Sequence, residues 1–201
     1  MLTALFFTLS GYLLGSILFA EIAAKIFHKD IISKSPDKNY GTANAYRYGG
    51  FFCGAFTLFF DMAKGFFPVF LYLRTDNPSM LFLPIVMVSP VIGHILPIFS
   101  RFKGGKAIAV TFGSLMGFFP DWSVAVALAF FFLFFTLIIR ISPHCYRTIL
   151  SYILATVFAF IFEPNKAIGV GMIFITVAVS MKMMSVEEER GKFEISWLWR
   201  H

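Results

Sequence analysis

The stretch GHILPIFSRFKGGKAIA, from Gly93 to Ala109, joins two apolar segments of the chain through a short basic region. This region carries Arg101, Lys103 and Lys106 around the glycine pair Gly104–Gly105. The chain as a whole is 58% hydrophobic and only 14% charged, whereas soluble domains contain about 25% charged residues. We therefore expect an integral membrane protein in which this basic region is a loop between two spans.

Hydropathy predicts an all-α integral membrane protein with seven transmembrane helices, forming a single domain over residues 1–201. A bilayer core of about 30 Å needs around 20 apolar helical residues, and the fourth predicted span is short by this measure. The first segment lacks a basic start and a small-residue cleavage site, so it is predicted to be retained as a helix. The predicted spans lie near Leu2–Ala24, Phe51–Leu73, Met80–Ser100, Ala107–Phe119, Trp122–Ile139, Thr148–Phe162 and Ala167–Met181.

The distribution of basic residues predicts the orientation of these spans. Of the 17 Lys and Arg residues, all but Lys64, Arg74 and Lys166 fall near helix ends or in loops that would share one side. Cytoplasmic loops carry such an excess of cations, so the N-terminus is predicted outside and the C-terminus in the cytoplasm. The net charge of +6 is explained in this way, and nucleic acid is not an expected partner.

The basic loop also has the features of an anion site. Two glycines followed by Lys106, where a helix is expected to begin, place backbone N–H groups and a cation at a helix N-terminus. The stretch is not a Walker A loop, because the G-x-x-x-x-G-K-[ST] pattern is absent. On this stretch alone, a flexible basic turn on the cytoplasmic side is an alternative of equal weight.

Another loop on the same side, NYGTANAYR, comes earlier in the chain and is called the first loop below. It supplies Asn39, Gly41, Asn44 and Arg47. An arginine side chain can bind a phosphate with two parallel hydrogen bonds, and asparagine side chains can orient a hydroxyl or a carbonyl. Asn44 is equally well explained as the cap of the next helix. Two glycine- and cation-bearing loops that face one side favour a shared phosphate pocket.

Polar residues inside the spans are interpreted mainly as structural. Asp61 and Lys64 are spaced i, i+3 and Glu21 and Lys25 are spaced i, i+4, so each pair can form an ion pair on one helix face. His94 lies next to the basic loop, where a buried, hydrogen-bonded histidine and a substrate-binding or general-base histidine are even alternatives.

No cofactor and no metal are predicted, because the sequence has no Cys/His cluster with metal-ligand spacing. The G-x-S-x-G elbow of serine hydrolases is also absent. An enzyme built from these residues would act by positioning and by cationic charge stabilisation. It would therefore suit a substrate that arrives already activated.

Four motifs follow one another along the chain: YLLGSI (Tyr12–Ile17), NYGTANAYRYGG (Asn39–Gly50), DMAKGFFP (Asp61–Pro68) and the opening stretch. In order and spacing they resemble those of the bacterial acyl-phosphate:glycerol-3-phosphate acyltransferases of the PlsY family. The resemblance implies transfer of a fatty acyl group from acyl phosphate to the 1-hydroxyl of glycerol 3-phosphate, giving 1-acylglycerol 3-phosphate and phosphate. It also implies a bacterial cytoplasmic (inner) membrane location, a site on the cytoplasmic face and membrane lipid as surroundings, with no obligate protein partner.

The resemblance assigns the site residue by residue. The catalytic residues would be Lys106, Arg47, His94 and Asn39. The substrate-binding residues would be Gly41, Asn44, Lys103, Gly104 and Gly105.

The chain departs from the family pattern at several positions, so it is identified as a divergent member. In the family the first loop usually reads G-S-G-N-x-G-A-T-N, but this chain has Asp37 and Ala43 in place of a serine and a threonine. Ala107 replaces the last glycine of G-G-K-G, and residues 182–186 lack the R-H-x-x-N pattern. Two alternatives therefore stay open: a weakly active relative that binds acyl phosphate or lysophospholipid, and a small anion transporter.

Overall fold

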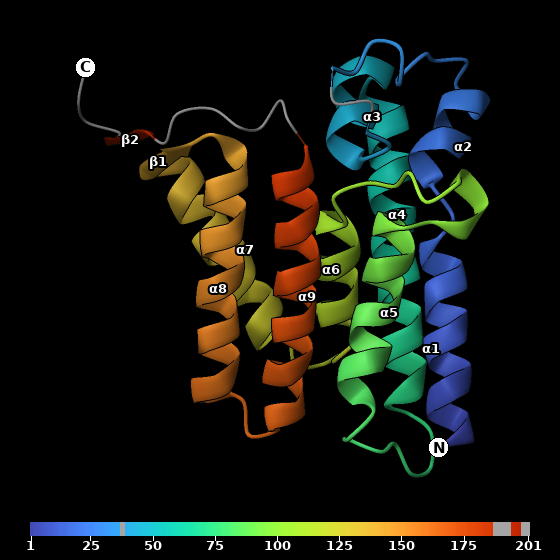
Figure 1. The fold of residues 1–201 in the computed structure, drawn as a ribbon, viewed down its shortest axis with the longest axis vertical. Helices are drawn as coiled ribbons and strands as arrows, with labels where there is room; N and C mark the ends of the chain where they lie inside the picture. Colours follow the sequence, from blue (N-terminus) through green and yellow to red (C-terminus); the bar gives the residue numbers. More distant parts are fainter. Residues whose placement is uncertain (37–38, 187–193, 198–201) are drawn as a thin grey trace.

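The structure, a computed structural model, describes residues 1–36, 39–186 and 194–197. The described part of the chain is helical, with one short two-stranded sheet (Figure 1). The helices are α1 (Leu2–Gly15), α2 (Phe19–Ile26), α3 (Thr42–Gly49), α4 (Phe51–Tyr72), α5 (Leu83–Ile95), the 3₁₀-helix η1 (Ile98–Ser100), α6 (Ile108–Met116), α7 (Ser123–Leu137), α8 (His144–Phe162) and α9 (Lys166–Ser185). The strands are β1 (Ile139–Ser142) and β2 (Glu194–Trp197), which pair antiparallel.

Within the described residues, five helical segments are long and apolar enough to cross a membrane: Leu2–Ile26, Phe51–Tyr72, Leu83–Ser100, His144–Phe162 and Lys166–Ser185. The helix α7 is apolar but has 15 residues, and α6 has nine. The helical membrane fold that the sequence predicts is therefore confirmed. The number of seven spans and their orientation stay predictions.

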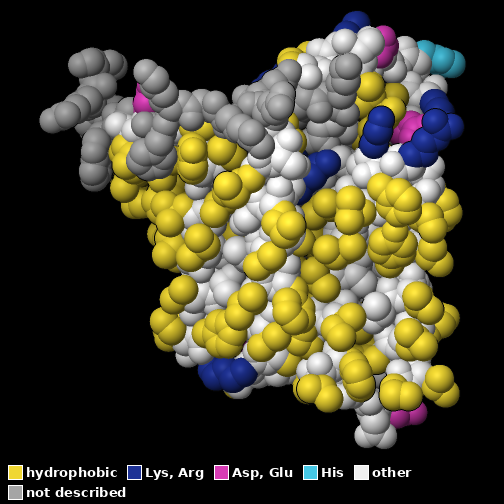
Figure 2. Space-filling view, viewed as in Figure 1, with side chains coloured by type: hydrophobic (Ala, Val, Ile, Leu, Met, Phe, Trp, Pro, Cys, Tyr) yellow, Lys and Arg dark blue, Asp and Glu magenta, His cyan; other side chains and the backbone are white. Residues whose placement is uncertain are grey.

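The long helices stand side by side (Figure 1), and the kinds of side chain on their surface change along their length (Figure 2). The N-terminus lies at the end opposite to α2, α3 and the C-terminal end of α9. Hydrophobic side chains cover most of the face shown in Figure 2, whereas Lys and Arg side chains gather at the end that carries α2 and α3. Large apolar side chains on the outer faces are exposed, among them Phe59, Phe130 and Phe162, as a lipid environment requires.

The first predicted span is interrupted, which the prediction of a continuous helix missed. Helix α1 ends at Gly15 and α2 begins at Phe19 after an extended Leu18. A carbonyl freed by such a break needs a hydrogen-bond partner at membrane depth. The side chain of Lys64, on α4, donates to the carbonyl oxygen of Ile17 over 2.6 Å, so the break is stabilised from a neighbouring helix.

The basic loop begins and ends at backbone breaks. Helix α5 stops at Ile95, two residues before Pro97, because the residue before a proline disfavours the helical conformation. Helix α6 begins only at Ile108, after Ala107 in the left-handed region with φ 59°. The expected helix start at Lys106 is therefore wrong, and this lysine lies before the N-cap of α6 rather than in its first turn.

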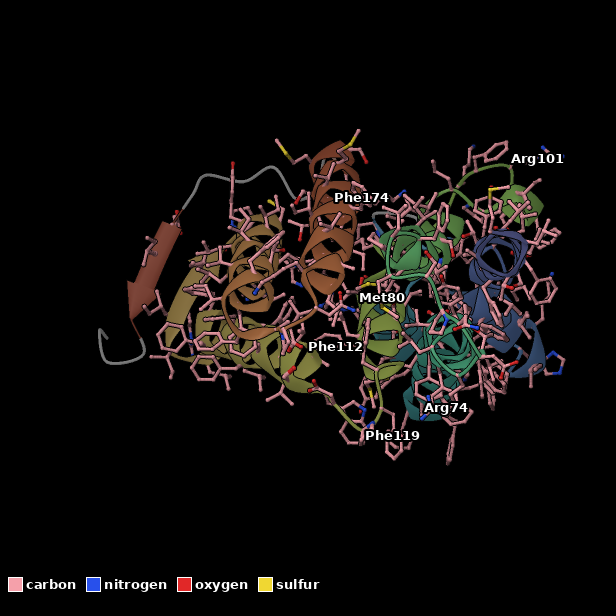
Figure 3. The ribbon with its side chains drawn as sticks, turned by 90° about the horizontal axis from the view of Figure 1, so that it is seen from below. Arg74, Met80, Arg101, Phe112, Phe119 and Phe174 are labelled. Atoms are coloured by element: carbon pink, nitrogen blue, oxygen red, sulfur yellow. The ribbon has the colours of Figure 1, made fainter. Side chains whose placement is uncertain are left out.

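Two further differences concern the polar segments. The long loop after α2 contains the short helix α3, which Gly50 separates from α4 with φ 87°. The strand β1 follows α7 directly and ends before Pro143, so the all-α prediction missed a two-stranded sheet. At the lower end of the molecule, Arg74 lies beside Phe119 (Figure 3) and donates to its carbonyl oxygen over 3.2 Å.

Helices α4 and α6 approach each other closely through reciprocal glycines. A Cβ atom at Gly65 would collide with the carbonyl oxygen of Val110, and one at Gly113 would collide with the carbonyl oxygen of Met62. Small residues at such crossings allow backbones in a membrane to pack directly. This contact fixes the start of α6, and with it the basic loop, against α4.

We expect Gly113→Val to destabilise the protein by about 3 kcal/mol, at the upper end of the usual cost of overpacking. The added side chain would meet the backbone of α4, which cannot move aside as a flexible side chain would. Unfolding in mixed detergent micelles measures this change. Ala55→Val, at an exposed position of α4, is the control and should cost less than about 0.5 kcal/mol; equal effects in both variants would contradict the close approach.

Candidate active site

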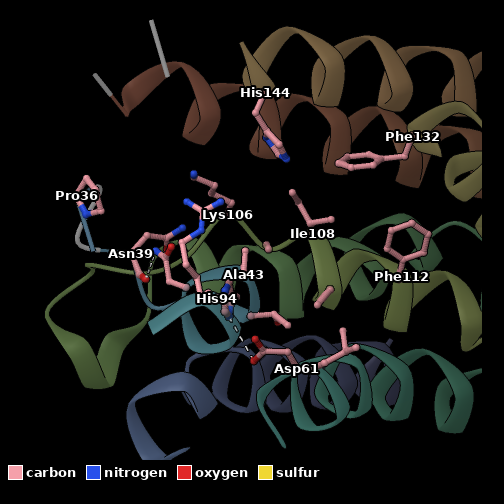
Figure 4. Close-up of a pocket in the computed structure, with 17 residues that line it drawn as sticks. Pro36, Asn39, Ala43, Asp61, His94, Lys106, Ile108, Phe112, Phe132 and His144 are labelled. Carbon is pink, nitrogen blue, oxygen red and sulfur yellow. Dashed lines mark hydrogen bonds and ion pairs between the residues drawn. The ribbon is translucent and has the colours of Figure 1, made fainter. Parts of the chain in front are cut away.

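A cavity of about 640 Å³ opens at the end of the helices that carries the basic loops (Figure 4). Its walls come from the segment around α3, from α4, α5, α7 and α8, and from the chain that enters α6. The lining residues are Pro36, Asn39, Gly41, Thr42, Ala43, Asn44, Arg47, Leu58, Asp61, His94, Lys106, Ala107, Ile108, Ala109, Phe112, Phe132 and His144. The structure thus brings together most of the residues that the sequence predicts for the site.

One wall of the cavity is cationic. Arg47, at the end of α3, is exposed, and Lys106 is half-buried at the entrance to α6. The two residues are far apart in the sequence, and the fold directs both to one cavity. Two cations on a concave surface attract an anion and can donate hydrogen bonds to its oxygen atoms.

Asn44 holds the first loop in place rather than capping a helix. Its amide nitrogen donates to Ser35 Oγ over 2.7 Å and to the carbonyl oxygen of Asn39 over 2.9 Å. An amide group has two hydrogens, so both are used in these bonds. The N-caps of α3 and α4 are Gly41 and Gly50, which excludes the capping alternative for Asn44.

His94 lines the cavity as a buried residue, in a polar cluster with Lys64 and Asp61. The ammonium group of Lys64 lies 2.8 Å from Asp61 Oδ1 and 2.8 Å from His94 Nδ1. Because an ammonium group is only a donor, His94 Nδ1 accepts this bond, and the neutral ring carries its proton on Nε2. This geometry favours the buried, hydrogen-bonded interpretation of His94, since the lone pair of Nδ1 is already occupied. It also confirms the expected Asp61–Lys64 ion pair.

The glycine pair packs against His94 and does not line the cavity. A Cβ atom at Gly104 would overlap the carbonyl oxygen of His94, and one at Gly105 would overlap its Nε2 atom. The amide of Gly105 donates to the His94 carbonyl oxygen over 3.0 Å. Lys103 is exposed and also lies outside the set of lining residues. A substrate-binding role for these three residues stays a prediction, whereas the packing of the two glycines follows directly from the geometry.

The remaining wall of the cavity is apolar. Leu58, Ile108, Phe112 and Phe132 line it, from α4, α6 and α7. In Figure 4 Phe112 and Phe132 lie on the side of the cavity away from Lys106 and Asn39. A cavity with a cationic wall and an apolar wall fits an amphiphile with an anionic head and a hydrocarbon tail.

Sequence reasoning missed two cavity residues that carry chemistry, His144 and Thr42. His144 is the first residue of α8, directly after Pro143. A polar residue at the start of a span, after a proline, was the available signal. Its approach to the cavity depends on how α8 packs, which no local pattern reports.

Comparison with known proteins gives the family of this chain. The family model described as glycerol-3-phosphate acyltransferase matches residues 5–189. The chain belongs to this family. A glycerol-3-phosphate acyltransferase from Idiomarina loihiensis is 32% identical over 191 residues, covering 92% of this chain and 94% of the relative. One from Hydrogenobaculum sp. is 44% identical over 125 residues, covering 62% of this chain and 63% of the relative.

Solved structures of the family agree with the fold. The crystal structure of PlsY (YgiH), an integral membrane glycerol 3-phosphate acyltransferase, in its glycerol 3-phosphate form, matches with a TM-score of 0.74 at 28% identity. The match covers 92% of this chain and 88% of that one. The lysophosphatidic acid form matches with a TM-score of 0.73 at 29% identity, covering 89% and 87%. The resemblance of this chain to the PlsY family, expected from its sequence motifs, is therefore confirmed.

The structure shows the conformational cost of one departure from the family pattern. Ala107 adopts φ 59°, a left-handed conformation that glycine adopts without strain and that costs an alanine roughly 1–2 kcal/mol. The glycine usual in the family would relieve this strain, while the alanine methyl is buried. Ala43 lines the cavity, and Asp37 lies outside the described residues.

Proposed function

We propose that this protein transfers a fatty acyl group from acyl phosphate to the 1-hydroxyl of glycerol 3-phosphate. The products are 1-acylglycerol 3-phosphate and phosphate. The observation that carries the proposal is the two-sided cavity: Arg47 and Lys106 on one wall suit phosphate oxygens, and Phe112 and Phe132 on the other suit an acyl chain. Family membership supports the reaction class.

The chemistry of an acyl phosphate suits these residues. This donor is a mixed anhydride, so its carbonyl carbon is already activated and no enzyme nucleophile is needed. The glycerol hydroxyl oxygen bonds to this carbon, the bond from the carbon to the phosphate oxygen breaks, and the phosphate leaves with the electron pair. The hydroxyl proton ends on the departing phosphate. Arg47 and Lys106 would stabilise the negative charge that develops on the carbonyl oxygen and on the phosphate.

The other predicted site residues support these two cations. Asn39 and Asn44 are buried at the cavity wall, and their mutual hydrogen bond keeps the first loop rigid beside Arg47. Gly41 lines the same wall. We propose that this wall binds glycerol 3-phosphate on the cytoplasmic face of the bacterial inner membrane, where both phosphorylated substrates would be available.

Transfer is tested with purified protein in lipid vesicles, palmitoyl phosphate and radiolabelled glycerol 3-phosphate, with organic extraction of the product. We expect labelled 1-acylglycerol 3-phosphate to form only when both substrates are present. Palmitoyl-coenzyme A replaces palmitoyl phosphate in a parallel reaction. Product from the thioester alone would refute the proposed donor, and no product from folded protein that still binds palmitoyl phosphate would indicate the weakly active relative.

A further inference from the structure

The first part of the basic loop, residues 96–103 and called the η1 loop below, presents apolar side chains at the surface. Phe99 and Phe102 are 65% and 57% exposed, and Leu96 and Ile98 are also exposed. All four lie beyond the end of α5, in the turn around η1. Apolar side chains that are exposed singly are normal, whereas a cluster with charged residues beside it is typical of an interaction surface.

Two cations accompany these apolar side chains. Arg101 and Lys103 are both exposed, and the ion pairs within the described part of the chain involve neither of them. The η1 loop itself contains no Asp or Glu. Figure 3 places Arg101 at the outer edge of the molecule, well apart from Phe112 of the cavity wall. The two charges therefore face outward, where they attract an external anion.

The backbone holds this arrangement at a conformational cost. Arg101 and Phe102 both adopt the left-handed region, with φ 52° and 60°, which is unfavourable for residues other than glycine. The amide of Phe102 donates to the carbonyl oxygen of Pro97 over 2.9 Å. The hydroxyl of Tyr12, on α1, donates to the carbonyl oxygen of Leu96 over 3.0 Å. Strain that the surrounding structure maintains in this way is often found where a segment makes a functional contact.

The level of the η1 loop along the helices suits the surface of a bilayer. In Figure 1 it is the green loop that follows α5 and lies near the junction of α1 and α2. Figure 2, in the same view, shows hydrophobic side chains giving way to Lys and Arg at about this level. Hydrocarbon is unfavourable for the two cations, and water is unfavourable for the apolar side chains. The headgroup region meets both requirements, and anionic lipids complement the two charges.

We propose that the η1 loop is a binding surface for anionic phospholipid. Its apolar side chains insert below the headgroups, and Arg101 and Lys103 contact the lipid phosphates. Neither cation lines the cavity, so this surface is separate from the candidate active site, and the inference does not depend on the proposed function. The loop leads through the glycine pair to Lys106 on the cavity wall. Lipid bound there would therefore hold the cationic wall at the membrane surface.

The test places a tryptophan in the loop with Phe99→Trp and measures its quenching by brominated lipid. The vesicles contain equal parts of phosphatidylcholine and phosphatidylglycerol, with bromine on the acyl chains of one lipid or of the other, and the signal of the three native tryptophans is subtracted. We expect brominated phosphatidylglycerol to quench about threefold more strongly than brominated phosphatidylcholine. Phe130→Trp, at an exposed position of the uncharged helix α7, is the matched control, and the two lipids should quench it equally.

Removal of the two charges separates headgroup binding from simple contact with lipid. In the Phe99→Trp protein, Arg101→Gln together with Lys103→Gln should abolish the preference for phosphatidylglycerol while quenching remains, because the apolar side chains are unchanged. A high concentration of sodium chloride should weaken the preference without any substitution of these cations. Equal quenching of Phe99→Trp by both lipids would overturn the inference, as would a preference that survives loss of both charges. Absence of quenching by both lipids would place the loop in water and would also overturn it.

Discussion

Replacing Lys106 with alanine is expected to lower kcat/KM for acyl transfer by about 10²–10³-fold, the usual cost of removing one donor to a developing oxyanion. Lys106 lines the cavity just before α6. Its ammonium group would be lost from the wall that also holds Arg47, so phosphate and carbonyl oxygens would lose a charged donor. Because the residue is half-buried in a loop rather than in the core, the protein should stay folded. The radiolabel assay and thermal unfolding in detergent measure the two effects.

Two further lysines serve as controls for Lys106→Ala. Lys29 is exposed and outside the cavity, so Lys29→Ala should keep at least half of the wild-type kcat/KM. Lys103 belongs to the same basic loop but is not a lining residue, so Lys103→Ala should cost less than about tenfold through weaker attraction of the substrates. Full activity in Lys106→Ala, or equal losses in all three variants, would contradict a direct contact between Lys106 and the substrate.

The positions of several long helices along the chain were predictable because they depend on local composition. Runs of apolar residues long enough to cross a bilayer predict α4, α8 and α9 closely. The break between α1 and α2 was not predicted, although it begins at Gly15–Ser16, a Gly/Ser pair of the kind at which helices often kink. It is stabilised by a hydrogen bond from Lys64, 47 positions away in the sequence, and only the packed structure brings that group to Ile17.

The candidate site was predictable to the extent that its residues belong to loops on one side. Arg47 and Lys106 meet in one cavity as expected, because cation-bearing loops on one face can share a pocket. The packing of Gly105 on His94 was not predictable, since a glycine pair before a helix suggests anion binding equally well. His144 was missed for the same reason: its place in the cavity depends on the position of α8 and not on its neighbours in sequence.

The cluster around Lys64 predicts a large effect on stability. Lys64 contacts Asp61 within α4, Ile17 at the break after α1 and His94 on α5, each within 2.8 Å. Lys64→Met keeps most of the side-chain volume but leaves Asp61 as a buried charge without its cation, and leaves the Ile17 carbonyl without this donor. We expect a loss of about 3–5 kcal/mol, the usual cost of removing one partner of a buried ion pair, measured by unfolding in mixed detergent micelles.

The matched control for Lys64→Met is Lys25→Met, which also breaks a lysine–carboxylate pair on one helix. The side chains of Lys25 and Glu21 are 74% and 35% exposed, whereas those of Lys64 and Asp61 are both 2% exposed. Water already screens the exposed pair, so its loss should cost less than about 0.5 kcal/mol. If both variants were destabilised equally, burial would not determine the contribution of Lys64. If Lys64→Met unfolded like the wild type but lost acyl transfer, Lys64 would act on the substrate through His94 rather than hold α1, α4 and α5 together.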